Sequence, residues 1–121
     1  MRYYRDVILP ALESGDIVSC QMQVSYELQE KFKHDNKTVQ PIKYVADFVL
    51  TFGDGHIEVI DTKGMPDTSA IIKRKMFWYH YPDLTYKWVS FTQATGWIDY
   101  DELKKIRNQR RRERKLSKNG E

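Results

Sequence analysis

Two aspartates and a lysine are the residues of this chain best suited to do chemistry together. Asp47 lies in one apolar segment, and Asp61 and Lys63 lie in the next. The Gly53-Asp54-Gly55 turn between these segments is typical of a β-hairpin, so the segments should pair as antiparallel strands. A turn centred on Asp54 places Asp47 directly opposite Asp61, with their Cβ atoms about 5 Å apart.

Lys63 should share the patch, because it follows Asp61 by two residues and its side chain leaves the same strand face about 6.5–7 Å further on. Two carboxylates so close repel each other, and a divalent cation would relieve that repulsion. Mg²⁺ is held in proteins by one or two carboxylates, waters and phosphate oxygens. Such a cation activates water for attack on phosphorus, and Lys63 could orient that water or neutralise a phosphoryl oxygen.

Two alternatives stay open at this point. A two-residue Asp54-Gly55 turn would shift the pairing by one residue and separate the two acids. The aspartates could instead face solvent with Lys63 as their salt-bridge partner, although Asp is disfavoured in strands.

The surrounding elements are predicted from apolar periodicity and from turn residues. Alternating or β-rich segments predict strands at residues 17–30, 42–52, 56–63 and 85–91. Helices are predicted at residues 3–14, from Thr68 or Ser69 to about residue 80, and from Asp99 onwards, where Glu102 completes a capping box. The order α-β-β-β-α-β-α predicts an α/β fold in which helices flank a short mixed β-sheet.

Several details of these elements can be checked against a structure. Pro10 should kink or shorten the first helix, which Gly15 should end. Residues 33–37 read as a loop or hairpin tip. Apolar residues on both faces of the central hairpin require a covering layer on each side. Apolar faces are expected in the first strand and in the second helix, formed by Met22, Val24, Tyr26 and Leu28 and by Ile72, Met76 and Tyr79 respectively.

Charge divides the chain into two parts. Residues 104–118 hold nine of the 20 Lys and Arg residues but only one of the 17 acids. The rest of the chain is therefore net acidic, although the overall charge is +3. A core domain over residues 1–98 and a basic helix or arm over residues 99–121 are therefore predicted. Such an arm is typical of a protein that binds polyanions, with Arg110, Arg111 and Arg112 as candidate contacts; the alternative is a solvated helix end that aids solubility.

Targeting and redox features are sparse. No apolar run approaches the roughly 20 residues that cross a bilayer, and the N-terminal residues do not have the pattern of a secretory signal. A cytoplasmic protein that does not enter membranes is therefore expected. The single Cys20 has no cysteine partner for a disulfide or a zinc site.

The segments that contain Asp47, Asp61 and Lys63 resemble those of a known protein family. The segments Tyr44-Val45-Ala46-Asp47-Phe48 and Ile57-Glu58-Val59-Ile60-Asp61-Thr62-Lys63-Gly64 resemble the core of the PD-(D/E)-x-K nuclease superfamily. From about Tyr3 to Phe91, the chain is similar to small phage and prophage endonucleases related to Holliday-junction resolvases. The resemblance implies a restriction-endonuclease-like fold, dependence on Mg²⁺ or Mn²⁺, a DNA substrate that is branched, a homodimer, and a bacterial host cell as the location.

Carried over by position, the resemblance makes Asp47 and Asp61 metal ligands, Lys63 the catalytic lysine and the Thr62 carbonyl a further metal ligand. Lys43 has the same strand parity as Asp47, and Lys73 and Lys75 lie on the helix that flanks the site in this fold. These three lysines, Lys43, Lys73 and Lys75, are candidate phosphate contacts.

Two positions depart from the family pattern. Ala46 stands where the superfamily nominally has Pro. The family's first helix also carries a Glu just before a Tyr-Tyr pair, and no Glu precedes Tyr3-Tyr4 here. Three interpretations follow: the chain is truncated, Asp6 or Glu13 substitutes, or metal binding is weakened.

The function expected from the sequence is that of a metal-dependent DNA endonuclease. It would hydrolyse backbone phosphodiesters, with selectivity for DNA structure, in phage or prophage recombination or replication. One alternative is a catalytically impaired nuclease-fold module that binds DNA. Another is a protein-interaction or packaging factor that uses the basic arm against acidic partners.

Overall fold

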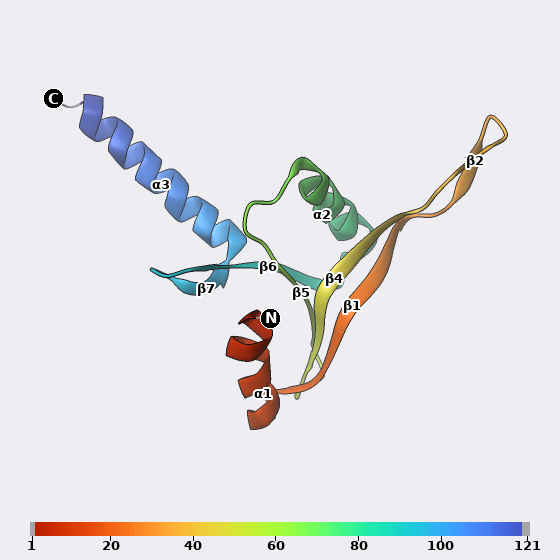
Figure 1. The fold of residues 1–121 in the computed structure, drawn as a ribbon, viewed down its shortest axis with the longest axis horizontal. Coiled ribbons are helices and arrows are strands. Elements are labelled where there is room, and N and C mark those ends of the chain that lie inside the picture. Colours follow the sequence, from red (N-terminus) through yellow and green to blue (C-terminus); the bar gives the residue numbers. More distant parts are fainter. Residues whose placement is uncertain (1, 120–121) are drawn as a thin grey trace.

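A mixed five-stranded sheet forms the centre of the protein in the computed structural model, which describes residues 2–119 (Figure 1). The strand order is β1-β4-β5-β6-β7. The β5–β6 pair is parallel and the other neighbouring pairs are antiparallel. The strands are β1 (Ile17–Gln29), β4 (Ile42–Phe52), β5 (Ile57–Thr62), β6 (Thr85–Thr92) and β7 (Gly96–Asp99). The predicted α/β class with a mixed sheet and flanking helices is confirmed.

The chain starts with a helix that accommodates a proline. A π-helical turn, η1 (Tyr4–Ile8), leads into α1 (Leu9–Ser14), and Pro10 lies in the first turn of α1. Pro10 has no N–H to donate, and a widened turn before it removes the need for a regular helical bond there. The predicted interruption therefore takes the form of a π-turn. Gly15, with φ at 89°, ends the helix as predicted.

Helices cover both faces of the sheet, as the apolar residues on both faces of the hairpin predicted. The face under η1 and α1 buries Tyr3, Ile8, Ile17, Phe48, Leu50, Ile60 and Val89. The other face packs against α2 (Thr68–His80) and buries Leu28, Tyr44, Ala46, Val59 and Phe77. The central hairpin is thus sandwiched between two apolar layers, which fixes the position of its strands.

The register of the β4–β5 hairpin is the one centred on Asp54. Phe48 pairs with Ile60 and Thr51 pairs with Ile57 across this turn. The alternative two-residue turn is therefore wrong, and the strand positions of Asp47 and Asp61 lie opposite each other just past the last paired residues.

A β-ribbon and a helix project from this body. The ends of β1 and β4 continue into a second hairpin, β2 (Phe32–His34) and β3 (Lys37–Val39), whose turn residues Asp35 and Asn36 have φ at 50° and 63°. The predicted hairpin tip is thus confirmed. In Figure 1, this hairpin and α3 (Tyr100–Asn119) extend away from the sheet toward opposite sides of the molecule.

The observed element order contains three short strands, β2, β3 and β7, that the sequence did not predict as strands. The β2–β3 pair was expected only as a loop or tip, and β7 was not expected at all. β7 is four residues long and follows a tight turn with Gly96 at φ 69°, so it offers too short a pattern to be seen in the sequence. Among the described helices, none is long and apolar enough to cross a membrane.

The predicted core face of α2 is only partly correct: Met76 is half-buried and packs against the core, but the other two predicted residues do not. Ile72 is 52% exposed and Tyr79 is 82% exposed, whereas Phe77 is fully buried. Two half-buried cations also lie on this side of the helix: Lys73 lines the polar pocket, and the Arg74 guanidinium packs over the Trp88 ring and pairs with Asp101. Because these two cations occupy part of the inner face, the apolar residues of the sequence predicted a core face that is rotated from the buried one. The helix is capped by the Asp67 carboxylate, which accepts the Ala70 N–H, and not by Thr68 or Ser69.

The apolar face predicted for β1 is only partly correct. Leu28 is buried and Val24 and Tyr26 are half-buried, but Met22 is 48% exposed. The strand is irregular next to Met22, because Gln23 has φ at 55°, in the left-handed region.

Candidate functional site

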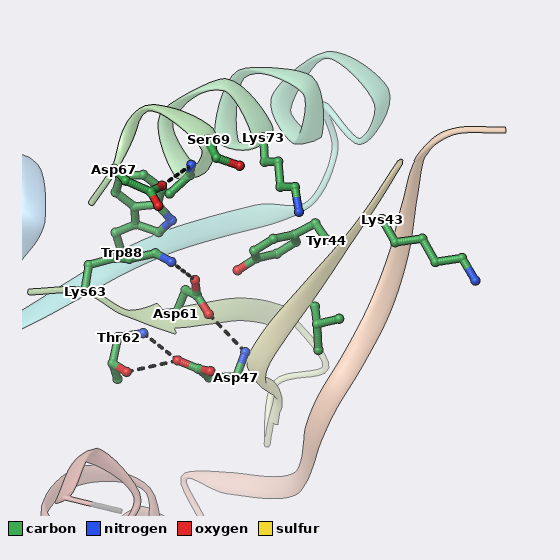
Figure 2. Close-up of a pocket in the computed structure, with 12 residues that line it drawn as sticks. Lys43, Tyr44, Asp47, Asp61, Thr62, Lys63, Asp67, Ser69, Lys73 and Trp88 are labelled. Carbon is green, nitrogen blue, oxygen red and sulfur yellow. Dashed lines mark hydrogen bonds and ion pairs between the residues drawn. The ribbon is translucent and has the colours of Figure 1, made fainter. Parts of the chain in front are cut away.

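A pocket of about 430 Å³ opens between the sheet and the start of α2. Its walls come from β4, β5, β6 and the N-terminal turns of α2 (Figure 2). The polar and aromatic residues that line it are Lys43, Tyr44, Asp47, Asp61, Thr62, Lys63, Asp67, Ser69, Lys73 and Trp88. All three predicted catalytic residues are therefore brought together in one pocket.

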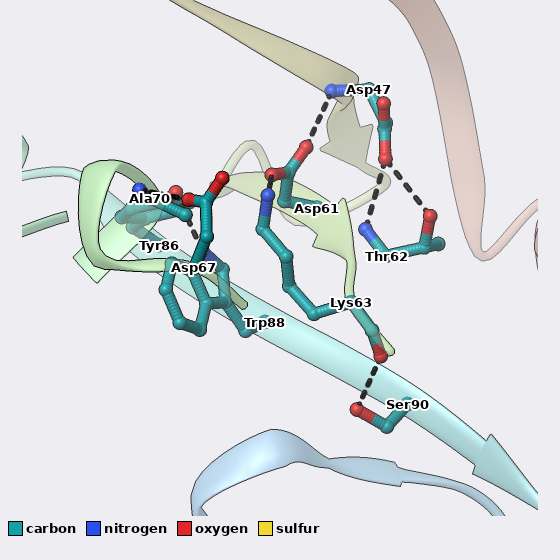
Figure 3. A network of polar contacts seen from close by, with 9 residues as sticks. All are labelled: Asp47, Asp61, Thr62, Lys63, Asp67, Ala70, Tyr86, Trp88 and Ser90. Carbon is teal, nitrogen blue, oxygen red and sulfur yellow. Dashed lines mark hydrogen bonds and ion pairs between the residues drawn. The ribbon is translucent and has the colours of Figure 1, made fainter. Parts of the chain in front are cut away.

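The two aspartates are held by the backbone of the opposite strand. The Asp47 N–H donates to Asp61 Oδ1 at 3.1 Å. The Thr62 N–H and the Thr62 hydroxyl both donate to Asp47 Oδ2, each at 2.9 Å (Figure 3). The ladder of backbone bonds between β4 and β5 ends here, and side-chain carboxylates take its place. This exchange fixes both acids with little rotational freedom.

Lys63 completes the site from the end of β5. Its Nζ lies 2.7 Å from Asp61 Oδ2. Its backbone is tied to β6, because the Lys63 N–H donates to the Val89 carbonyl at 2.8 Å and the Ser90 hydroxyl donates to the Lys63 carbonyl at 2.7 Å. The lysine is thus anchored at its main chain, while its flexible side chain extends across the pocket.

Asp61 is the electrostatic centre of the pocket. It is only 3% exposed, and this burial raises the pKa of its carboxyl. The ammonium of Lys63 opposes that rise in pKa, and the charge of Asp47 adds to it. A buried carboxylate with a second acid beside it favours any positive charge that can approach, whether an ammonium group or a metal ion.

The donor set fits a hard cation. Asp47, Asp61 and the Thr62 carbonyl offer oxygen atoms, which suit Mg²⁺ or Mn²⁺ better than zinc. Within residues 2–119, no group of three or more His, Cys, Asp or Glu side chains is placed to hold a metal. A cation here would therefore depend on two carboxylates, a backbone carbonyl, and oxygens of water or substrate.

The first helix does not supply a third acid to the pocket. Asp6 accepts a hydrogen bond from the Trp97 indole at 3.2 Å and pairs with Arg2 and Arg5. Glu13 is exposed on α1. Neither acid lines the pocket, so neither substitutes there for the Glu of the family pattern.

The candidate phosphate contacts lie at three places. Lys43 and Lys73 line the pocket from β4 and α2. Lys75 is exposed on α2 outside the pocket lining. The arginines Arg110, Arg111 and Arg112 are exposed on α3, well along the projecting helix (Figure 1).

Tyr44 is a pocket residue that sequence reasoning missed. A regular strand would direct Tyr44 and Asp47 to opposite faces, because they are three residues apart. In β4, however, the side chains change faces at Asp47: Phe48 packs under the N-terminal helix, whereas Ala46 and Tyr44 pack with α2. This irregularity lies opposite Gln23 of β1 and brings Tyr44 into the pocket.

Asp67, Ser69 and Trp88 were also missed. The aspartate and serine come from the loop and first turn of α2, and Trp88 comes from β6. The Trp88 indole N–H donates to the Tyr86 hydroxyl at 2.7 Å, and Lys63 Nζ lies 5.3 Å from the centre of a Trp88 ring. The predicted helix start was a signal for the first two residues, but only the parallel β5–β6 pairing places Trp88 beside Lys63.

Comparison with protein families gives one match. The model of a family described as "Protein of unknown function (DUF1064)" matches residues 1–95, which include the whole pocket and end before α3. No curated protein and no solved structure matches the chain.

Proposed function

We propose that this chain, which belongs to the DUF1064 family, is a metal-dependent DNA endonuclease of the restriction-endonuclease-like kind. The observation that carries the proposal is the convergence of Asp47, Asp61 and Lys63 in a pocket flanked by Lys43 and Lys73. Paired carboxylates beside a lysine are the groups that metal-assisted hydrolysis of a phosphodiester requires.

Each residue has a distinct part in the proposed reaction. Asp47, Asp61 and the Thr62 carbonyl would hold Mg²⁺ or Mn²⁺. When bound, such a cation supplies an activated water and positive charge for the oxygens on phosphorus. Lys63 leaves Asp61 and neutralises a phosphoryl oxygen or orients the attacking water. Thr62 keeps Asp47 in place through its N–H and its hydroxyl.

Charge around the pocket supports a nucleic-acid substrate. Lys73 carries positive charge at the pocket, and Lys43 lies at its edge with its side chain directed away from the aspartates (Figure 2). The basic residues of α3 add a separate sequence-independent attraction for phosphates. We further propose selectivity for branched DNA, as in resolvase-like enzymes of phages or prophages, and a homodimer. A symmetric dimer would present one pocket to each of two strands.

A cleavage assay tests the proposal. Four-way junction, flap and duplex DNA are incubated with Mg²⁺ or Mn²⁺ and with the wild type, Asp47→Asn, Asp61→Asn or Lys63→Met. We expect each variant to lose at least ~100-fold in rate, and a chelator to stop the wild type. Asp83→Asn is the matched control, because Asp83 is exposed and does not line the pocket. Wild-type cleavage rates in Asp61→Asn would reject the proposed site.

A second candidate function is that of a nuclease-fold module that binds DNA without cutting it. Two observations favour it: within residues 2–119 no three His, Cys, Asp or Glu side chains are placed to hold a metal together, and Lys63 is paired with Asp61. This candidate predicts that the wild type retains DNA in a binding assay and leaves it intact with either metal.

A further inference from the structure

We infer that Tyr44 is a positioning residue whose hydroxyl takes over Asp61 when Lys63 moves to the substrate. This inference rests on the proposed function, because it concerns the same pocket. It adds a new step to the proposed function: Tyr44 replaces Lys63 as the hydrogen-bond partner of Asp61.

The first observation is the state of the Tyr44 hydroxyl. Tyr44 is 7% exposed, and its buried hydroxyl makes no hydrogen bond of regular geometry among the described residues, although Tyr86 and Asp61 are its polar neighbours. Buried polar groups are nearly always paired, so an unpaired one calls for an explanation. The close-up in Figure 2 shows this hydroxyl pointing into the pocket toward Asp61.

The second observation is that the ring of Tyr44 is fixed by its neighbours. The ring centres of Tyr44 and Tyr86 are 5.3 Å apart, and those of Tyr44 and Phe77 are 5.6 Å apart. The Tyr86 hydroxyl already accepts the Trp88 indole N–H. The aromatic cluster therefore holds the Tyr44 ring in place, with its hydroxyl on the pocket side.

Tyr44 also remains a hydrogen-bond donor. The neutral phenol carries an O–H group, and a carboxylate oxygen can accept a hydrogen bond from it.

The third observation is that the Lys63 ammonium group is needed at two places. In this structure, Lys63 Nζ pairs with Asp61 Oδ2 at 2.7 Å. The proposed reaction needs the same ammonium group at the phosphate or the attacking water. Its departure would leave Oδ2 of a carboxylate that is 3% exposed without that partner, which costs free energy. The Tyr44 hydroxyl is the buried donor at hand, and its bond would keep Asp61 oriented toward a metal ion.

The test compares Tyr44→Phe with Tyr26→Phe. Tyr26 belongs to the same aromatic cluster around Phe77, but it does not line the pocket. Each variant deletes one hydroxyl and keeps the ring. The measurements are the affinity for Mn²⁺ alone by calorimetry without DNA, kcat and KM for DNA cleavage, and the thermal midpoint.

We expect Tyr44→Phe to bind Mn²⁺ about 10–100-fold more weakly, as for other residues that orient a metal ligand. Its kcat at limiting Mn²⁺ should fall by a similar factor, while KM for DNA stays unchanged. Its thermal midpoint should change little, because the deleted hydroxyl makes no hydrogen bond of regular geometry among the described residues. Tyr26→Phe should match the wild type in Mn²⁺ affinity and in kcat.

Two results would overturn the inference and can be told apart. If the wild type binds Mn²⁺ and cleaves DNA, and Tyr44→Phe does both equally well, the role of Tyr44 is rejected while the nuclease remains. If the wild type neither binds Mn²⁺ nor cleaves any DNA, the proposed function fails, and the inference fails with it.

Discussion

His56 shows how a single residue responds to its charged neighbours at the end of the hairpin remote from the pocket. Its ring stacks on Phe52, with ring centres 4.2 Å apart. One ring nitrogen contacts the Asp54 carboxylate, and Nε2 lies 2.9 Å from Glu58 Oε2. Glu58, and then Asp54, raise the pKa of His56 above its ordinary value of 6.5. The protonated ring therefore links the turn to β5.

This raised pKa predicts a pH-dependent stability. A histidine whose pKa is higher in the folded state stabilises the protein fully below its unfolded-state pKa. That stabilisation is lost as pH rises through the folded-state pKa. We expect His56→Gln to lower the thermal midpoint at about pH 6 and to lower it less at about pH 8.5. His80→Gln is the control, because His80 forms no ion pair within residues 2–119, and a similar pH pattern in it would contradict the assignment.

Among the elements, α2 gives the sharpest test of the fold, because Phe77, its most buried residue, was not among the predicted core residues. Phe77 is fully buried against Tyr26, Tyr44, Tyr81 and Tyr86. We expect Phe77→Ala to lower the free energy of unfolding by about 3–5 kcal/mol, measured by urea denaturation. Tyr79→Ala should change it by about 0.5 kcal/mol or less, because Tyr79 is 82% exposed. The reverse order would mean that the helix is rotated.

The elements also show what a sequence can and cannot predict. The β4–β5 register followed from local information, because glycines flank Asp54 and the strand residues nearest the turn, from Phe48 to Ile60, pair regularly. The orientation of α2 depends on distant partners: the Arg74 guanidinium lies 4.0 Å from a Trp88 ring centre and 3.1 Å from Asp101. Neither contact can be predicted from the apolar periodicity of the helix, so the sequence did not indicate that these cations lie on its inner side.

The candidate site, like the elements, was predictable only where local sequence information determines the structure. Asp47 and Asp61 follow from the register, and Lys63 follows from strand alternation. Tyr44 does not follow, because alternation assigns it to the wrong face. Its place depends on an irregularity of β4 opposite Gln23, a non-glycine residue with φ at 55° that no turn motif announces.

At the scale of the whole molecule, positive charge is separated from the acidic body. α3 is tied to the sheet by its first turns, where Leu103 is 5% exposed, and the residues beyond Ile106 up to residue 118 are exposed. A helix that is polar on all sides gains little from packing. The separation suits the proposed function, in which the arm would supply affinity for phosphates and the pocket would supply the chemistry.

The arm can be tested without disturbing the pocket. We expect replacement of Arg110, Arg111 and Arg112 by Gln to weaken DNA binding, measured by fluorescence anisotropy. The slope of log affinity against log salt should become shallower by about 0.9 for each phosphate of duplex DNA that the arm no longer neutralises. Cleavage at saturating DNA should keep its rate. An unchanged slope would show that the arm is a solvated helix end, and Asp61→Asn, which should keep the wild-type slope, is the control.

The Gly53-Asp54-Gly55 turn has a consequence for how related sequences can diverge. The Gly53 N–H donates to the Asp16 carbonyl at 3.0 Å, and a side chain at Gly53 would lie 3.3 Å from the Gly15 carbonyl oxygen. Surface turns usually accept insertions, but this one is clamped against the end of α1, and a one-residue slip would turn Asp61 away from Asp47. Lineages that retain the pocket should therefore keep the 13 residues between these aspartates, and length variation should collect instead at the Asp35-Asn36 tip.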